Sequence, residues 1–299
     1  MAGEGGKELR FYYPMPRFPS VSVTGPTCKL NCKHCGSHYL NHMPNVDTSE
    51  KLKSFSARLE AEGGVGLLIS GGSTPEGRVP LDGFYPAIRW IKDHTGLIVN
   101  LHCGLIGASE AEEIAASGVD IASVDLVGSE ETIRGVYGLS ARVEDYRDAL
   151  LSLVDAGVPQ VAPHVCVGLD HGAVKGERRA LEIASEISPE VIVLLGLIPT
   201  AGTPMADVNP PSAEDMGKAA TWAREASPIS EVALGCMRQR AGRIDLEERL
   251  MEAGATRFTL PSKATVETAN EMGCRVRFFD GCCAMPRSLE AKGLRPDSA

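Results

Sequence analysis

Short apolar runs alternate with amphipathic segments along most of this chain. Runs of this length that are rich in Val, Ile and Leu are typical of buried strands, and a three-to-four-residue apolar repeat is typical of helices. The expected strands are 21–24, 66–70, 97–103, 119–126, 160–167, 191–197, 231–236 and 257–260. The expected helices are 49–61, 81–93, 110–116, 143–156, 173–187, 212–226, 243–253 and 263–272.

This alternation of strand and helix predicts parallel βαβ units in an α/β fold. A (β/α)8 TIM-type barrel of about 250 residues accounts for one domain at 20–273. A doubly wound open sheet is the alternative, because counting elements does not establish closure. Residues 1–19 then form a short N-terminal arm. Residues 274–299 form a C-terminal extension that contains cysteines and one more strand-like run at 275–279.

Charge and hydropathy narrow the class of protein. The chain has 30 Lys and Arg against 39 Asp and Glu, which gives a net charge of −9 without a basic block. We therefore expect no nucleic-acid partner. No apolar run reaches the roughly 18 residues of a membrane span, and the first residues do not resemble a signal peptide. We expect a soluble cytoplasmic protein.

Nine cysteines point to metal or catalytic chemistry, because their number is odd and a reducing cytosol disfavours disulfides. In a parallel barrel, the functional residues follow the carboxyl ends of the strands. Six of the cysteines stand at or near such ends: Cys28, Cys32, Cys35, Cys103, Cys166 and Cys236. The sequence therefore predicts a thiol-rich site on one face of the barrel.

The densest of these groups has the spacing Cys28-x3-Cys32-x2-Cys35. Thiolates favour zinc or iron–sulfur clusters. A closed zinc site needs four ligands, which His34 or His38 could complete. Alternatively, three thiolates hold a four-iron cluster and leave one iron without a protein ligand, which makes that iron reactive.

This cysteine motif after the first strand of a barrel resembles the radical S-adenosylmethionine (SAM) superfamily. The resemblance implies a [4Fe-4S] cluster whose open iron binds SAM. It also implies an electron donor of the ferredoxin or flavodoxin type, which drives cleavage of SAM to a 5′-deoxyadenosyl radical. The barrel would orient these groups and exclude water.

Other strand ends carry residues that the resemblance assigns to SAM. A Gly-Gly turn follows the second strand, where glycine permits close approach of the backbone. An acidic residue at the fourth strand looks like the ribose contact, and a Gly-rich stretch after the fifth presents an aliphatic side chain to adenine. An arginine after the seventh strand could fix the SAM carboxylate. The residues concerned are Gly71, Gly72, Ser73, Asp125, Leu169 and Arg238.

Within the superfamily, the order of motifs over roughly residues 20–260 resembles the biotin-synthase branch. Biotin synthase holds a second, sulfur-donating cluster with three cysteines and an arginine. Cys103 and Cys166 match two of those cysteines, but Ser70 or a neighbouring glycine takes the place of the third, and Ala233 takes that of the arginine. Biotin synthase itself is therefore not expected.

Two interpretations of the remaining cysteines stay open. They either rebuild an auxiliary cluster or are small buried apolar side chains. The candidates for the cluster are Cys103, Cys166, Cys236, Cys282 and Cys283, with Cys274 as a further possibility.

An auxiliary cluster would indicate sulfur insertion at an unactivated carbon, as in the archaeal two-component lipoyl synthase. The partners would then be a second radical SAM subunit and an octanoylated carrier protein. Cofactor biosynthesis without sulfur insertion is the alternative within the branch. A non-enzymatic zinc or iron–sulfur carrier is the alternative from another class.

Overall fold

The computed structural model describes residues 7–296, and these contain one parallel ten-stranded sheet. The order of the strands is β10-β1-β9-β8-β7-β6-β5-β4-β3-β2, and every neighbouring pair is parallel. The bounds are β1 Glu8–Tyr12, β2 Ser20–Ser22, β3 Gly66–Ser70, β4 Ile98–His102, β5 Ile121–Asp125, β6 Gln160–Val167, β7 Val191–Gly196, β8 Glu231–Leu234, β9 Arg257–Thr259 and β10 Arg275–Phe279.

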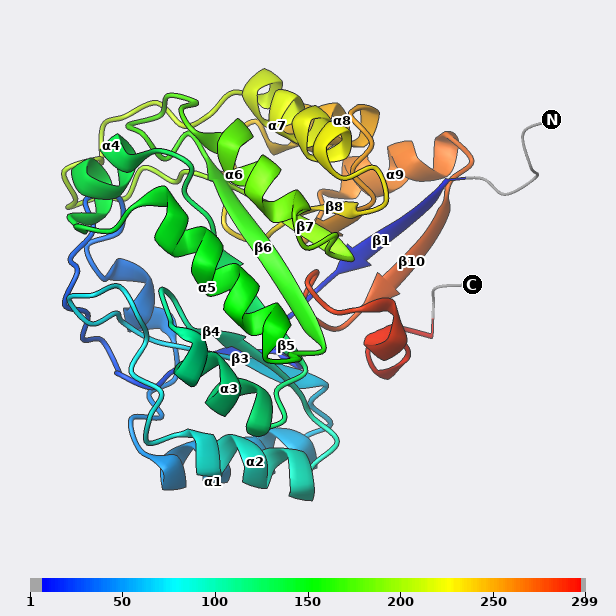
Figure 1. The fold of residues 1–299 in the computed structure, drawn as a ribbon. Coiled ribbons are helices and arrows are strands. Elements are labelled where there is room, and N and C mark those ends of the chain that lie inside the picture. Colours follow the sequence, from blue (N-terminus) through cyan, green and yellow to red (C-terminus); the bar gives the residue numbers. More distant parts are fainter. Residues whose placement is uncertain (1–6, 297–299) are drawn as a thin grey trace.

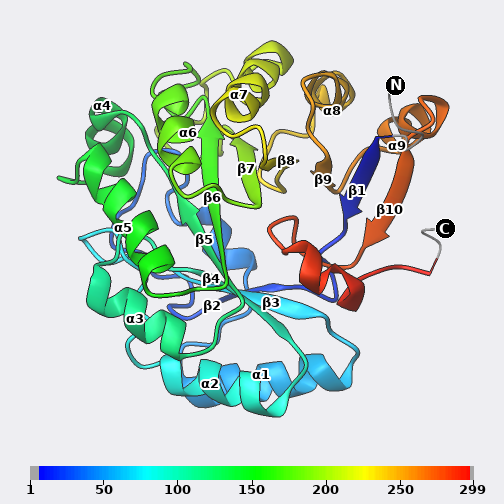
Figure 2. The ribbon, with the colours of Figure 1, turned by 45° about the vertical axis from the view of Figure 1, so that its right-hand side comes forward.

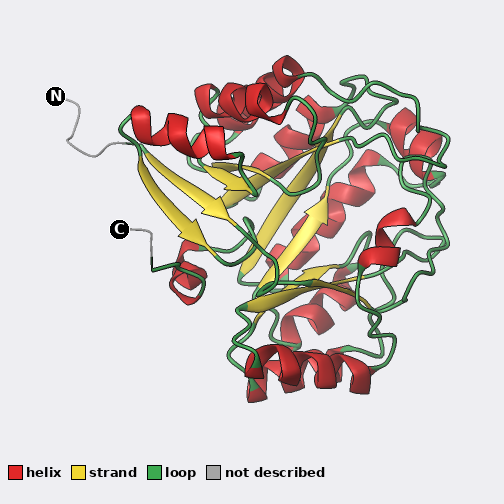
Figure 3. Cartoon of the chain, turned by 180° about the vertical axis from the view of Figure 1, so that it is seen from behind, coloured by secondary structure: helices red, strands yellow, loops and turns green. Residues whose placement is uncertain are grey.

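The helices cover the outer face of this curled sheet (Figure 1). Their bounds are α1 Ser49–Ala61, α2 Tyr85–His94, α3 Ala108–Ala116, α4 Glu130–Thr132, α5 Val143–Asp155, α6 Glu177–Ser185, α7 Ala213–Ala226, α8 Arg243–Glu252 and α9 Lys263–Glu271. Short turns of other helical types lie at η1 His38–His42, η2 Ile133–Tyr137 and η3 Arg287–Lys292. Seen from behind, the strands form the inner wall and the helices the outer layer (Figure 3).

The expected closed eight-stranded barrel is wrong. Within the described residues, the sheet ends at β2 and β10, which do not pair with each other, and Figure 2 shows the open side between them. The reason lies in the segment expected as an N-terminal arm, where β1 pairs with β9 through Arg10 opposite Arg257. Because β1 takes the free edge of β9 and β10 then pairs with β1, β9 cannot pair with β2. The doubly wound alternative fails as well, since the helices cover one face (Figure 2).

Side chains of the strands alternate between two apolar layers. Outward side chains such as Val99 and Leu101 pack beneath the helices. Inward side chains, including Ile121 and Val193, line the inside of the curled sheet, which we call the lumen. The C-terminal segment 282–285 joins this inner layer and packs in it together with Tyr12 and Phe18 from the N-terminal part of the described chain.

Three strands, β3, β6 and β10, have the same bounds as the runs predicted from the sequence. Among residues 7–296, no helix combines the length and the apolar character needed to cross a membrane.

Candidate functional site

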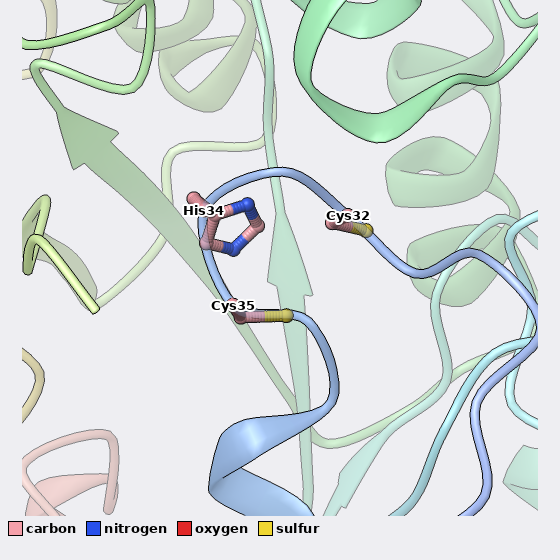
Figure 4. A group of neighbouring side chains, drawn as sticks. All are labelled: Cys32, His34 and Cys35. Carbon is pink, nitrogen blue, oxygen red and sulfur yellow. The ribbon is translucent and has the colours of Figure 1, made fainter. Parts of the chain in front are cut away.

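The cysteine motif lies in the loop between β2 and η1, at the carboxyl ends of the strands. A tight turn folds the motif back on itself, because the amides of Cys35 and Gly36 both donate to the carbonyl of Cys32, at 3.1 and 2.8 Å. The turn gathers the sulfurs of Cys32 and Cys35 and a ring nitrogen of His34 within 4.8 Å of one another (Figure 4). Hydrogen bonds of the backbone therefore hold these three side chains close together.

The third cysteine of the motif is held by the segment after β3. The amide of Ser73 donates to Sγ of Cys28 at 3.3 Å, and the Ser73 carbonyl accepts from the amide of Lys29 at 2.9 Å. Gly72, which precedes Ser73, has no room for a side chain, because a Cβ there would lie 2.0 Å from the carbonyl oxygen of Thr27. The Gly-Gly turn thus supports the thiol directly.

Two further contacts fix the loop from other sides. The amide of Lys33 donates to the carbonyl of Val136 in η2 at 2.9 Å. The hydroxyl of Tyr39 in η1 lies 2.8 Å from that of Thr200, beyond β7. Because β3, η2 and the loop after β7 all contact the motif, its three cysteines are positioned by distant parts of the sheet.

The two neighbouring thiols of the loop, Cys32 and Cys35, share a hydrogen bond that favours the thiolate at Cys35. The side-chain hydrogen bond from Cys32 lowers the pKa of Cys35 to about 7, and the same interaction raises the pKa of Cys32. Burial lowers the pKa of His34 to about 4, so its imidazole is neutral near pH 7. Its buried Nδ1 has no hydrogen-bond partner among residues 7–296. Three sulfurs, one of them receiving an N–H, fit the iron–sulfur cluster that the motif predicts.

Two adjoining cavities lie under the loop, at the carboxyl end of the lumen. One, of about 130 Å³, is bordered by the segment after β3 and by β4 and β5. The other, of about 200 Å³, is bordered by Cys35 and Tyr39 and by the ends of β6 and β7. Both cavities are lined by His102, Asp125 and Tyr137, so these side chains form the wall between them.

Most residues that the sequence assigned to SAM line these cavities. Gly71, Ser73 and Asp125 border the smaller cavity, and Asp125 and Leu169 border the larger one with Cys35. Gly72 lies against the cysteine loop. The structure therefore brings five of the six residues to one place.

Arg238 is different, because its side chain is fully buried in an ion pair and lines neither cavity. Its Nη2 lies 2.7 Å from Oε1 of Glu247, and both side chains are 0% exposed. Its Nη1 donates to the carbonyl of Gly235 at 2.7 Å. These contacts occupy the guanidinium, and Arg238 is not among the residues that line either cavity.

The cysteines expected in an auxiliary cluster fall in three places. Cys103 faces outward into the apolar layer under the helices, and burial raises its pKa to about 12. Cys166 borders the larger cavity. Cys236, Cys282 and Cys283 lie together, close enough to influence each other's pKa. The five do not form one site, because the alternation along β4 turns Cys103 away from the lumen.

A polar band that was not predicted from the sequence lies inside the lumen. His102 on β4 and His164 on β6 meet edge to face with ring centroids 5.5 Å apart. Asn100 lies two residues before His102 on β4, and its Oδ1 accepts a hydrogen bond from the hydroxyl of Ser123 on β5 at 2.9 Å. The available signal was a polar side chain at every second position of otherwise apolar strands, which marks one face of the sheet.

A methyl group at position 72 is expected to disturb the cysteine loop. In Gly72→Ala, the new Cβ must displace the carbonyl of Thr27 and with it Cys28, whose Cα would be 2.6 Å away. We expect a loss of bound iron and a decrease in SAM cleavage on the order of 100-fold, because small displacements at a reacting centre have effects of that size. Iron analysis and product assay check this, with Gly83→Ala as the control, since a Cβ at Gly83 meets nothing within 4 Å. Equal activity of the two variants would contradict the assignment of the cysteine loop as the metal-binding site.

Comparison with known sequences places this arrangement in a family. The profile described as Radical SAM superfamily matches residues 22–172, which are 151 of the 299 residues. Biotin synthase of Photobacterium profundum is 26% identical over 239 residues, covering 77% of this chain and 65% of that protein. Biotin synthase of Acinetobacter baylyi is 26% identical over 268 residues, covering 86% of this chain and 79% of that protein. The chain thus spans less than two thirds of the first relative.

Solved structures share the fold. The FeFe-hydrogenase maturase HydG from Carboxydothermus hydrogenoformans superposes with a TM-score of 0.64 at 15% identity, over 92% of this chain and 69% of that one. Methylornithine synthase (PylB) superposes with a TM-score of 0.60 at 16% identity, over 89% of this chain and 83% of that one. Together with the cysteine loop and its cavities, the family match identifies the chain as a member of the radical SAM superfamily.

Proposed function

We propose that Cys28, Cys32 and Cys35 hold a [4Fe-4S] cluster and that SAM binds beside it in the two adjoining cavities. When bound, the cluster supplies the electron that splits SAM into methionine and a 5′-deoxyadenosyl radical, which takes a hydrogen atom from an unactivated carbon. The observation that carries this proposal is the shared lining of the cavities, since Cys35 and Asp125 border the same space.

The residues of the chain have distinct tasks in this proposal. The carboxylate of Asp125 faces both cavities and accepts hydrogen bonds from the ribose hydroxyls. The side chain of Leu169, which is 4% exposed, offers an apolar contact to adenine. Gly71 leaves the backbone open to the methionine part. The surrounding strands exclude water, which protects a radical from side reactions.

The substrate carbon is then expected in the lumen, beyond the polar band of His102 and His164. We propose sulfur insertion into an alkyl chain as the reaction, with an octanoyl group on a carrier protein as the substrate class and a second radical SAM subunit as partner. Support comes from the biotin-synthase relatives and from the sulfur-bearing side chains along the lumen, Cys166 among them. The apolar inner layer below the band suits an alkyl chain.

Product analysis tests the proposed function. The protein is reconstituted with iron and sulfide without oxygen, reduced with dithionite and incubated with SAM. We expect 5′-deoxyadenosine and methionine in equal amounts. A colourless protein that holds zinc and leaves SAM intact would instead establish the carrier function.

The electron donor is expected to dock on the cysteine loop. Although the chain carries a net charge of −9, residues 21–46 contain no Asp or Glu. Lys29, Lys33, His38 and His42 are exposed on this segment. A local positive surface next to the cluster attracts an acidic flavodoxin or ferredoxin, and charge complementarity of this kind acts mainly on the association rate.

Reversal of these charges should slow electron delivery without affecting the cluster. For Lys29→Glu/Lys33→Glu we expect SAM cleavage with flavodoxin to fall about tenfold at low salt, and cleavage with dithionite to stay unchanged. Lys218→Glu/Lys263→Glu changes the net charge equally at positions on α7 and α9, outside the cysteine loop. A rate with flavodoxin that is the same in both double variants would rule out this docking face.

A further inference from the structure

Two polar side chains that border both cavities, His102 and Tyr137, have no task in the proposed binding of SAM. His102 is the last residue of β4, and Tyr137 is the last residue of η2. Within residues 7–296, the structure shows no hydrogen bond to the ring nitrogens of His102 or to the hydroxyl of Tyr137. Polar groups in the interior of a protein normally have partners. Two open polar groups on one wall therefore point to a ligand.

The position of Tyr137 is fixed by the cysteine loop. Tyr137 closes the π-helical turn η2, a wide turn of a kind that is frequent at functional sites. The carbonyl of the neighbouring Val136 accepts from the amide of Lys33 at 2.9 Å. The ring of Tyr137 meets that of His34 edge to face, with centroids 5.4 Å apart. Burial raises the pKa of Tyr137 well above its usual value, so its hydroxyl keeps its proton and can donate.

His102 is supported by a second histidine on the inner face of the sheet. Its ring meets that of His164 edge to face, with centroids 5.5 Å apart. Nδ1 of His164 donates to the carbonyl of Ala162 at 2.9 Å, which fixes the supporting ring. Burial lowers the pKa of His164 to about 4, so this ring is neutral near pH 7. A neutral imidazole at position 102 carries one N–H donor, which can be offered to the same space as the hydroxyl of Tyr137.

The charges around the cavities disfavour an anionic substrate. Among the residues that line the two cavities, Asp125 is the only Asp or Glu, and none is Lys or Arg. A substrate carboxylate would face the carboxylate of Asp125 without such a cation to offset its charge. Because an unpaired charge is costly to remove from water, the group that His102 and Tyr137 bind is expected to be an uncharged acceptor.

The larger cavity also has an apolar part, formed by the end of β7 and the loops after β7 and β8. Its residues are Leu195, Leu197, Ile198 and Met237. Polar donors beside apolar side chains suit an acyl group, because a carbonyl oxygen has two lone pairs for two donors and the alkyl carbons pack against the apolar residues.

We propose that His102 and Tyr137 bind the carbonyl oxygen of an uncharged acyl group, such as an amide, and that the site rejects the corresponding free acid. The proposal rests on the proposed function, which supplies the acyl chain as the substrate class. It adds that the chain must arrive already joined to its carrier, because only the joined form lacks the charge. Both side chains border the space assigned to SAM, so the acyl group lies next to the radical that attacks it.

Binding of two ligands of the same shape tests the proposal. Octanamide and octanoate are nearly equal in size, and only octanoate is charged. The reconstituted protein is kept oxidised with saturating SAM, so that SAM is not cleaved. Titration calorimetry at about pH 8, where an ordinary imidazole is neutral, measures both affinities. We expect octanamide to bind about tenfold more tightly than octanoate. Equal affinities, or tighter binding of octanoate, would overturn the proposal.

Substitutions assign the contact to the two side chains. Tyr137→Phe removes only a hydroxyl, and His102→Leu removes the ring nitrogens. Each should weaken the binding of octanamide about tenfold and leave the affinity for SAM unchanged. His102→Gln keeps an N–H donor and should restore most of the loss. The matched control is Tyr85→Phe, which removes a hydroxyl from a buried tyrosine on α2 that lines neither cavity.

The contrary result is equally definite. If Tyr137→Phe and His102→Leu bound octanamide like Tyr85→Phe but lost affinity for SAM, both side chains would belong to the SAM site and the proposal would be wrong. Near-ultraviolet circular dichroism shows that the variants compared are folded. SAM cleavage by the reduced, unaltered protein is measured separately. Absence of 5′-deoxyadenosine there would refute the proposed function and leave the binding of octanamide as an independent result.

Discussion

Cys32→Ala is expected to reduce formation of 5′-deoxyadenosine at least about 1,000-fold, which corresponds to about 4 kcal/mol in the activation barrier. The side chain of Cys32 lies in the centre of the motif, and the loop offers no other thiol in its place. Without it, a cluster bound by two thiolates is not retained in a reactive form. Anaerobic reconstitution followed by product assay and iron analysis measures the effect.

The matched control is Cys274→Ala, which removes a thiol next to β10. Its rate and iron content should equal those of the unaltered protein. Thermal unfolding of Cys32→Ala should change little, because the loop lies outside the sheet. If Cys32→Ala kept its iron and its rate, the cysteine motif would not be the site of SAM cleavage.

Arg238→Met should destabilise the fold by about 3–5 kcal/mol, because it leaves the carboxylate of Glu247 buried without its cation. Glu247 is 0% exposed, and its remaining partners are the amide of Ser262 and the hydroxyl of Thr265, at 2.7 and 2.6 Å. Urea unfolding measures the loss. We expect the affinity for SAM to be unchanged wherever the variant is folded.

Arg240→Met provides the comparison, since Arg240 is exposed two residues further along. Surface changes of this kind stay within about 0.5 kcal/mol. An Arg238→Met protein that unfolds like Arg240→Met but binds SAM weakly would return Arg238 to the SAM site.

The hydrophobic pattern predicted the individual strands and helices better than it predicted whether the sheet closes into a barrel. Strand β6 could be predicted because its run is long and apolar and is followed by glycine. Strand β1 was missed, since Glu8 and Arg10 interrupt its apolar pattern and its partner strands come about 250 residues later. Whether the last strand meets the first depends on such pairings, which no local pattern reports.

The candidate site could be predicted where residues with suitable side chains directly follow neighbouring strands. Cys28 and Gly72 follow two neighbouring strands, so their meeting at one edge followed from the parallel sheet. The direction of a side chain after a strand was not predictable. Arg238 and Cys103 follow strands in the same way, yet one pairs with Glu247 and the other faces the helices. Asn100 alternates with His102 along β4, which marks one face of the sheet but does not report what the Asn100 amide contacts.

The most direct test of the central claim uses electron–nuclear double resonance on the reduced, reconstituted protein. SAM labelled with ¹⁵N in the amino group and ¹⁷O in the carboxylate is added before freezing. If the cluster held by Cys28, Cys32 and Cys35 has an iron open to SAM, both labels will show hyperfine coupling to the cluster. A spectrum that stays the same with and without SAM would contradict the account.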